Sequence, residues 1–207
     1  MPTHGPRPPA ASGRSAAVSM VQQGRVVHRD LATSPVPHLT AAGVSARITD
    51  PGRHTAEQAT AAAIQDELID EFLGAAAYLF TVPMYNYSMP SLFKAWLDQI
   101  MVDGRTLDFT NGSPAAGRPA VVISARGGGY GPRAPNHGLD HVVPALETIL
   151  GHSHTLGLDM TTVTPELTPA PHTPAMAPLI PLHEASLASA HEQAQHLART
   201  AAERAAA

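Results

Sequence analysis

Residues 75–91, AAAYLFTVPMYNYSMPS, join an apolar run to a loop that carries two tyrosines and an asparagine between prolines. The run at 75–82 lacks the alternation of a half-exposed strand, so it predicts a parallel strand that is buried on both faces. Residues 119–125, PAVVISA, repeat the pattern and lead into a glycine-rich segment, RGGGYGP, at 126–132. Because ligands of open α/β sheets bind where the parallel strands end, we expect the two loops to line one site.

Helical patterns separate these apolar runs. Thr55 and Gln58 have the spacing of a capping box, and apolar residues at 64, 68 and 72 share one face, which predicts a helix over 55–73. Ser91 is expected to cap a second helix, in which residues 92, 96 and 100 share a face. Weaker patterns predict helices at 14–23, 138–150 and 183–204, strands at 25–29 and 158–163, and a long connection at 40–54. This alternation of strand and helix is typical of an open α/β sheet.

The composition excludes several classes of protein. The chain has 207 residues, about the length of one domain, and its 43% hydrophobic and 14% charged residues make it too apolar for a disordered protein. Its formal net charge of -4 offers no basic field for nucleic acid or for an anionic membrane surface. The absence of cysteine excludes disulfides, thiolate metal sites and a cysteine nucleophile, so redox chemistry would require a bound cofactor.

No targeting or membrane signal is evident in the sequence. No apolar run approaches the roughly 18 residues that span a bilayer, and the first residues, MPTHGPRPPAASGRS, contain no signal-peptide core. A cytoplasmic location without a membrane partner is therefore expected.

Two other kinds of site have weaker support. Histidines suggest a metal at His137 and His141, on a shared helix face, or at His152 and His154, although scattered histidines are usually surface residues. Residues 151–155, GHSHT, are similar to a nucleophile elbow, but Thr155 replaces the required glycine and a helix is predicted where a strand should precede the elbow. We therefore expect neither a bound metal nor a catalytic side-chain nucleophile.

Four motifs occur together in one order: PMYN at 83–86, TLDFTNGSP at 106–114, VVIS at 121–124 and ARGG at 125–128. In this order and spacing the chain resembles the flavodoxin-like FMN-dependent NADH azoreductases and their NAD(P)H quinone oxidoreductase relatives. The match is best over residues 55–166, and VVHRDLATSPVPHL at 26–39 is similar to the second strand and following loop of that family. The resemblance implies one flavodoxin-like domain over residues 1–207, an open parallel sheet with helices on both faces.

The resemblance also implies how FMN is held. The ring would lie against one loop on each side, formed by Met84, Tyr85, Asn86 and Tyr87 and by Arg126, Gly127 and Gly128. Phe109 falls where the family carries an aromatic residue over the substrate pocket, and Tyr130 falls where relatives have histidine. Judged from the residues alone, the tyrosines could instead only pack a loop, and Arg126 could only pair with a carboxylate.

The phosphate end of the site has a weaker basis. The family binds the phosphate with hydroxyls of an S-x-S pattern at the start of a helix after the first strand, where free N–H groups favour an anion. The candidates here are Ser12 and Ser15, which do not form that pattern, and only MPTH stands where the first strand is expected. We therefore expect residues 1–13 to be irregular, the first, central strand to be truncated or missing, and the true start to lie upstream of Met1.

The function implied by the resemblance is that of a homodimer that uses FMN to transfer hydride from NADH or NADPH to quinones and azo compounds. Turnover would be ping-pong, because donor and acceptor would use the same face of the flavin. The flavin would carry the chemistry, and the protein would orient the ring and donate hydrogen bonds to it. The degenerate amino terminus keeps one alternative open, a flavodoxin-like binding or regulatory protein that has lost FMN.

Overall fold

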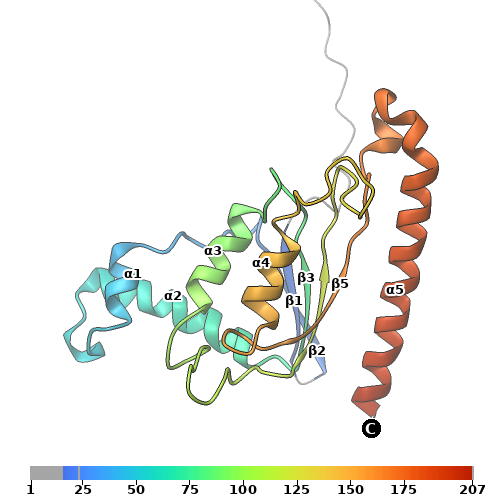
Figure 1. Ribbon diagram of the computed structural model, residues 1–207. Coiled ribbons are helices and arrows are strands. Elements are labelled where there is room, and N and C mark those ends of the chain that lie inside the picture. The colour runs from blue at the N-terminus through green and yellow to red at the C-terminus, as the bar shows by residue number, and fades with distance from the viewer. Residues whose placement is uncertain (1–15, 23, 207) are drawn as a thin grey trace, which may run out of the picture.

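The computed structural model describes residues 16–22 and 24–206. Its strands form one sheet in the order β2-β1-β3-β4-β5 (Figure 1). The strands are β1 (Ala17–Gln22), β2 (Arg25–Asp30), β3 (Ala77–Thr81), β4 (Pro119–Ile123) and β5 (Asp159–Val163). The α-helices are α1 (Ala41–Ala46), α2 (Ala56–Leu73), α3 (Ser91–Ile100), α4 (Val143–Leu146) and α5 (Ile180–Ala206). Shorter helical turns lie at Pro51–Arg53, Glu147–Gly151, Ala170–His172 and Pro174–Leu179.

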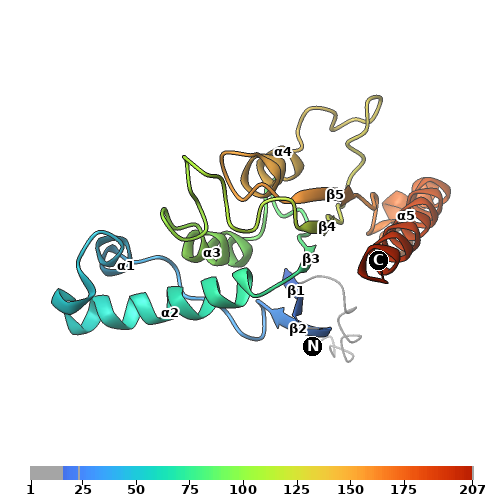
Figure 2. The ribbon, with the colours of Figure 1, turned by 90° about the horizontal axis from the view of Figure 1, so that it is seen from below.

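Helices cover both faces of the sheet. Figure 2 shows α1 to α4 on one face and α5 on the other. Strands β3, β4 and β5 pair in parallel, with Phe80 opposite Val122. The open α/β sheet that the sequence predicts is therefore confirmed.

The core lies between the sheet and helices α2 and α3. Phe72 from α2, Phe80 from β3 and Trp96 from α3 are fully buried. The ring centroid of Trp96 lies 5.8 Å from that of Phe80 and 6.1 Å from that of Phe72. These aromatic contacts fix both helices against the sheet, so the strand ends that carry the candidate site are rigidly supported.

The two main helices begin differently. The hydroxyl of Thr55 accepts from the Gln58 N–H at 3.2 Å, and the Gln58 side chain accepts from the Thr55 N–H at 2.9 Å, so the predicted capping box is confirmed. At the start of α3, Pro90 occupies the cap position and no side chain accepts a bond from the helix. The expected cap at Ser91 is therefore wrong, since the fixed φ of Pro90 leads the chain directly into a helix that starts at Ser91.

The helix predicted at 14–23 is wrong, because residues 17–22 form β1, an interior strand between β2 and β3. This strand pairs antiparallel with both β2 and β3, so it runs against the other four strands. Val18 and Met20 are 0% and 1% exposed, whereas Val21 is 39% exposed, and this alternation suits a strand. Without β1, the backbone N–H and C=O groups along one edge of β3 would have no partners, and residues 17–21 pair with them. Local helix propensity does not include this pairing, so it predicts the wrong structure.

The helix predicted at 138–150 starts later than expected. Gly138 has a left-handed φ of 82°, and Asp140 accepts hydrogen bonds from the N–H groups of Val142 and Val143, so α4 begins only at Val143. Residues 137 and 141 therefore lie in a loop and share no helix face. The shared helix face that was expected for His137 and His141 as a metal-binding pair is therefore wrong.

The connection expected at 40–54 contains a helix that the sequence patterns did not indicate. The hydroxyl of Thr40 accepts from the Gly43 N–H at 3.1 Å and caps α1. Gly43 is buried against α2, where a Cβ atom would lie 3.2 Å from the amide of Gln65. The short helix is thus held by packing on α2, which a local pattern of small residues does not reveal.

Helix α5 is tied to the sheet near its start. The Ser186 hydroxyl accepts from the Glu166 N–H at 2.9 Å, and His183 Nδ1 lies 3.4 Å from the Glu166 carbonyl. Its charged and polar residues recur along its length, and no helix in the described ranges is both long and apolar enough to cross a membrane.

Candidate functional site

The loops that follow β3 and β4 meet at the carboxyl edge of the sheet. The Met84 N–H donates to the Ala125 carbonyl at 2.8 Å, which continues the pairing of the two strands into the loops. The Arg126 N–H donates to the Pro165 carbonyl at 3.0 Å and so ties in the loop that follows β5. The sequence-predicted loops are therefore neighbours on one rim.

Residues 85–88 form a tight turn that presents two aromatic rings. Tyr85 and Ser88 exchange backbone hydrogen bonds of 2.8 and 3.0 Å, while Asn86 and Tyr87 have φ values of 50° and 67°. Left-handed backbone costs about 1–2 kcal/mol for a residue with a side chain and is concentrated at functional sites. Tyr85 and Tyr87 are 45% and 50% exposed. This turn therefore holds flat apolar surface toward solvent at an energetic cost.

The glycine-rich loop carries consecutive backbone donors. The N–H groups of Gly127, Gly128 and Gly129 donate to no residue in the described part of the chain, and the same is true of the N–H groups of Asn86 and Tyr87. Consecutive free N–H groups form a cradle for an acceptor or anion. The two loops thus bring five backbone donors to one edge of the sheet.

Arg126 is 3% exposed, and its guanidinium is largely occupied within the protein. Nη1 donates to Oδ2 of Asp140 at 2.6 Å, and Nη2 donates to the Ser124 hydroxyl at 3.3 Å. Its Cζ atom lies 5.4 Å from the centroid of the Tyr130 ring. The carboxylate pairing that the sequence left open is therefore present, while Nε is buried without an acceptor among the described residues.

Two pKa values reflect this arrangement. Burial alone raises the pKa of Asp140, but the hydrogen bonds from Arg126 and from two backbone N–H groups outweigh it, so the pKa lies below its usual value. Burial raises the pKa of Tyr130, and neighbouring Tyr87 raises it further against the opposing influence of Arg126. At neutral pH the guanidinium is therefore neutralised by one carboxylate, and Tyr130 keeps its proton.

The glycines of the loop are not equivalent. A Cβ atom on Gly128 would lie 2.5 Å from Nδ2 of Asn136, whereas one on Gly127 would make only an ordinary contact of 3.6 Å with Pro169. A side chain at Gly128 would therefore displace the amide of Asn136 and would also narrow the space for a ligand at this loop.

Most of the sequence-predicted residues come together in space, namely Met84, Tyr85, Asn86, Tyr87, Arg126, Gly127, Gly128 and Tyr130. Phe109 does not join them. It is 66% exposed and lies in the segment between α3 and the amino end of β4, whereas the two loops follow the carboxyl ends of β3 and β4.

The phosphate candidates Ser12 and Ser15 lie outside the described residues. The resemblance implies a helix start after the first strand, but β1 is followed by Gly24, β2 and a loop that reaches Thr40. Among the described residues, the expected phosphate-binding helix is therefore replaced by a β1–β2 hairpin.

The structure adds little support for the two alternative sites, a histidine metal site and a nucleophile elbow. The rings of His152 and His154 are 5.3 Å apart, but within the described ranges no group of three His, Asp or Glu side chains could hold a metal ion. The GHSHT segment follows a helical turn that ends at Gly151 instead of a strand. It therefore lacks the strand-to-helix geometry of a nucleophile elbow.

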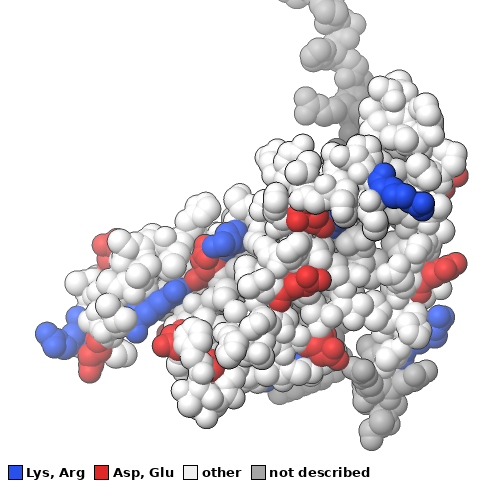
Figure 3. Space-filling view, in the orientation of Figure 1, with Lys and Arg blue, Asp and Glu red and all other residues white. Residues whose placement is uncertain are grey.

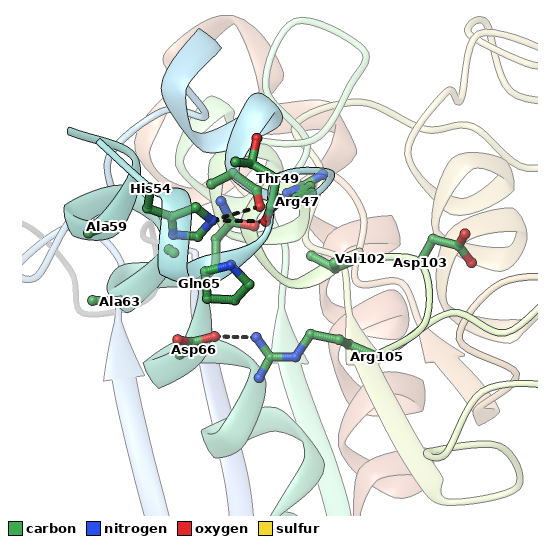
Figure 4. A pocket seen from close by; sticks show the side chains of 13 residues that line it. Arg47, Thr49, His54, Ala59, Ala63, Gln65, Asp66, Val102, Asp103 and Arg105 are labelled. Atoms are coloured by element: carbon green, nitrogen blue, oxygen red, sulfur yellow. Dashed lines mark hydrogen bonds and ion pairs between the residues drawn. The ribbon is translucent and has the colours of Figure 1, made fainter. Parts of the chain in front are cut away.

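A separate cavity of about 420 Å³ lies beside α2 and is bordered by Arg47, His54 and Arg105 (Figure 4). Its polar groups mainly bond to one another or to backbone: Arg47 Nε donates to Gln65 Oε1 at 2.8 Å, Arg105 pairs with Asp66, and His54 contacts two backbone carbonyls. Few polar groups are left to select a ligand, so this cavity is a weaker site than the loop edge. Figure 3 likewise shows charged side chains scattered over one face without a continuous basic area.

Sequence reasoning missed three residues that shape the edge: Asp140, Glu166 and Asn136. Asp140 holds Arg126, Glu166 accepts from the Tyr130 N–H at 2.8 Å, and Asn136 packs on Gly128. Asp140 and Asn136 lie 14 and 8 residues after their partners Arg126 and Gly128, and Glu166 lies in another connection, after β5. No fixed sequence spacing therefore identifies these residues.

The sheet order, the helices on both faces and the two adjacent loops at the carboxyl edge define a flavodoxin-like α/β protein. A family described as having a flavodoxin-like fold matches residues 9–177, and the chain belongs to this family.

Two streptomycete proteins are similar to the chain over most of its length. The chain is 44% identical to an FMN-dependent NADH:quinone oxidoreductase of Streptomyces avermitilis, over 94% of this chain and 88% of that protein. It is also 44% identical to a protein of the same name from Streptomyces coelicolor, over 88% and 81% of the two chains.

Solved structures share the fold. An azoreductase from Bacillus anthracis superposes with a TM-score of 0.68 at 22% identity, over 83% of this chain and 80% of that one. An FMN-dependent NADH-azoreductase from the same species, in complex with FMN, gives a TM-score of 0.65 at 24% identity, over 82% and 80%.

Proposed function

We propose that this chain is an FMN-dependent NADH:quinone oxidoreductase that also reduces azo compounds. The names of the Streptomyces relatives support the donor and the quinone, and those of the Bacillus structures support the azo activity. The observation that carries the proposal is the set of five backbone N–H groups, at Asn86, Tyr87 and residues 127–129, without acceptors among the described residues.

The ring end of FMN fits these two loops. A flavin ring is flat and carries acceptor atoms along one edge, which suits the exposed rings of Tyr85 and Tyr87 beside free N–H groups. The buried Nε of Arg126 adds a donor that lacks an acceptor among the described residues. The phosphate end is not assigned, because Ser12 and Ser15 lie outside those residues.

Each part of the site then has a defined task. Bound FMN supplies the hydride-transfer chemistry. The backbone N–H groups at residues 86–87 and 127–129 would donate hydrogen bonds to the ring edge of bound FMN, and such preorganised donors are effective because they need no reorientation during the reaction. Asp140 fixes Arg126 and balances its charge. None of these tasks requires a side-chain nucleophile.

The proposed assembly is a homodimer. Phe109 is expected over the substrate pocket, yet within one chain it lies in the segment that leads into the amino end of β4, whereas the two loops follow the carboxyl ends of β3 and β4. A second copy of the chain can bring its Phe109 to this site, which gives the exposed ring a partner surface. Because NADH is an intracellular metabolite, we also infer a cytoplasmic location.

The test uses purified protein and a matched pair of variants. We expect visible flavin absorbance and NADH oxidation that depends on added benzoquinone. Asn86→Gly keeps the left-handed turn and should retain flavin, whereas Asn86→Val strains the turn and should lower the ratio of flavin to protein several-fold. Colourless protein with no quinone-dependent NADH oxidation would instead support a flavin-free binding protein.

A further inference from the structure

A cavity of about 450 Å³ adjoins the glycine-rich loop on the side of α5. The backbone of Gly128 and Gly129 forms one wall. Four apolar side chains contribute to the rest of the lining, and they are Leu167, Met176, Leu179 and Leu182. Its volume falls within the roughly 300–1,000 Å³ of small-molecule sites.

The chemistry of this cavity is mainly apolar. Glu166 lies at its border, but its Oε1 already accepts from the Tyr130 N–H at 2.8 Å. Arg133, the other charged residue of the lining, is exposed and makes no ion pair among the described residues. The four apolar side chains therefore favour a hydrocarbon group over a polar one.

The backbone at Leu167 supports a functional role for the cavity. Leu167 has a φ of 57°, which is rare and strained for a bulky residue. Its N–H lies 3.4 Å from the Gly128 carbonyl, so the apolar wall and the candidate flavin loop are joined directly. A ligand lying against residues 127–128 would therefore be next to this cavity, because Gly128 also lines it.

We propose that this cavity binds the apolar side chain of a quinone acceptor whose ring lies against the loops at 84–87 and 127–128. The proposal rests on the proposed function and narrows its substrate class to quinones with a hydrocarbon tail. A tail of several methylene groups gains about 0.8 kcal/mol for each group that it buries, which is about fourfold in affinity.

The test compares two acceptors that share one ring, a dimethoxy-methyl-benzoquinone and its decyl derivative. The wild-type protein should show a KM at least tenfold lower for the decyl compound. Met176→Trp fills the cavity and should abolish most of that preference, and Leu182→Gln, at a position 60% exposed, should reduce it about threefold. The KM for the parent quinone should change less than twofold in both variants.

Leu139→Gln is the matched control, because Leu139 is also exposed but is not among the residues that line the cavity. Calorimetric titration with the decyl quinone, without NADH, reports binding independently of turnover. Binding that is lost in Met176→Trp and kept in Leu139→Gln supports the proposal, whatever the reductase activity. Equal binding to all variants, or equal loss for both quinones, would overturn it, while absence of quinone reduction alone would overturn only the proposed function.

Discussion

The guanidinium of Arg126 donates to Oδ2 of Asp140 at 2.6 Å, and Oδ1 of the same carboxylate accepts from the N–H groups of Val142 and Val143. One carboxylate thus joins the loop after β4 to the start of α4. Because Arg126 is 3% exposed, its charge is balanced mainly by this partner. The pair is therefore a structural support of the proposed flavin edge.

Removing one partner of this pair should be costly. Asp140→Ala leaves a buried guanidinium without its carboxylate, and we expect the free energy of unfolding to fall by about 3 kcal/mol. This value is at the lower end for buried pairs because the Asp140 side chain is 20% exposed. Arg126→Met should cost less, since the carboxylate left behind can be hydrated. Urea unfolding of both variants measures the difference. An equal loss in the two variants would contradict the unequal burial of the partners.

The same pair predicts a pH dependence. The folded-state pKa of Asp140 lies below its unfolded value of about 3.9, so ionised Asp140 stabilises the fold above that pH. This stabilisation is lost as the pH falls through the folded-state pKa. The stability difference between wild type and Asp140→Asn should therefore be constant near neutral pH and shrink below about pH 4. A difference that stays constant across the acid range would show that Asp140 acts without its charge.

A third prediction separates the two glycines of the loop. Gly128→Ala should lower stability by about 1 kcal/mol, because its Cβ would lie 2.5 Å from Nδ2 of Asn136, while Gly127→Ala should be nearly neutral. Adding Asn136→Ala should restore the stability of Gly128→Ala, and a double-mutant cycle measures this coupling. If the double variant is no more stable than Gly128→Ala, the steric explanation fails.

Local signals were sufficient for part of the fold. The capping box at Thr55 and Gln58 needs only residues within one turn, and the apolar runs at 75–82 and 119–125 indicate the strands β3 and β4 by composition. The expected burial of the first run on both faces is wrong, because Leu79 is 39% exposed on the face opposite to buried Phe80. The two loops were also predictable, because the carboxyl ends of parallel strands meet at one edge. The roles proposed for their residues remain predictions.

The remaining features depend on distant contacts. Residues 17–22, AVSMVQ, mix alanine and methionine, which favour helices, with valine, which favours strands, so composition does not decide between them. The decision is made by pairing with β2 and β3, and β3 lies more than fifty residues later in the sequence. Likewise, nothing near Arg126 in sequence indicates that Asp140 holds it.

The orientation of side chains in β1 yields the last prediction. In the strand, Val18 and Met20 face the core and Val21 faces the other way. In the helix expected from the sequence, Val18 and Val21 would share a face instead, because residues three apart are neighbours on a helix.

Alanine substitutions at these three positions therefore distinguish the two structures. For the strand, Met20→Ala should cost about 2–5 kcal/mol and Val18→Ala a comparable or somewhat smaller amount, whereas Val21→Ala should cost less than about 1 kcal/mol because Val21 is 39% exposed. For a helix, Val18→Ala and Val21→Ala should have similar costs. Urea unfolding of the three variants provides the ranking. A cost at Val21 equal to that at Val18 would mean that residues 17–22 do not form the antiparallel strand between β2 and β3 in solution.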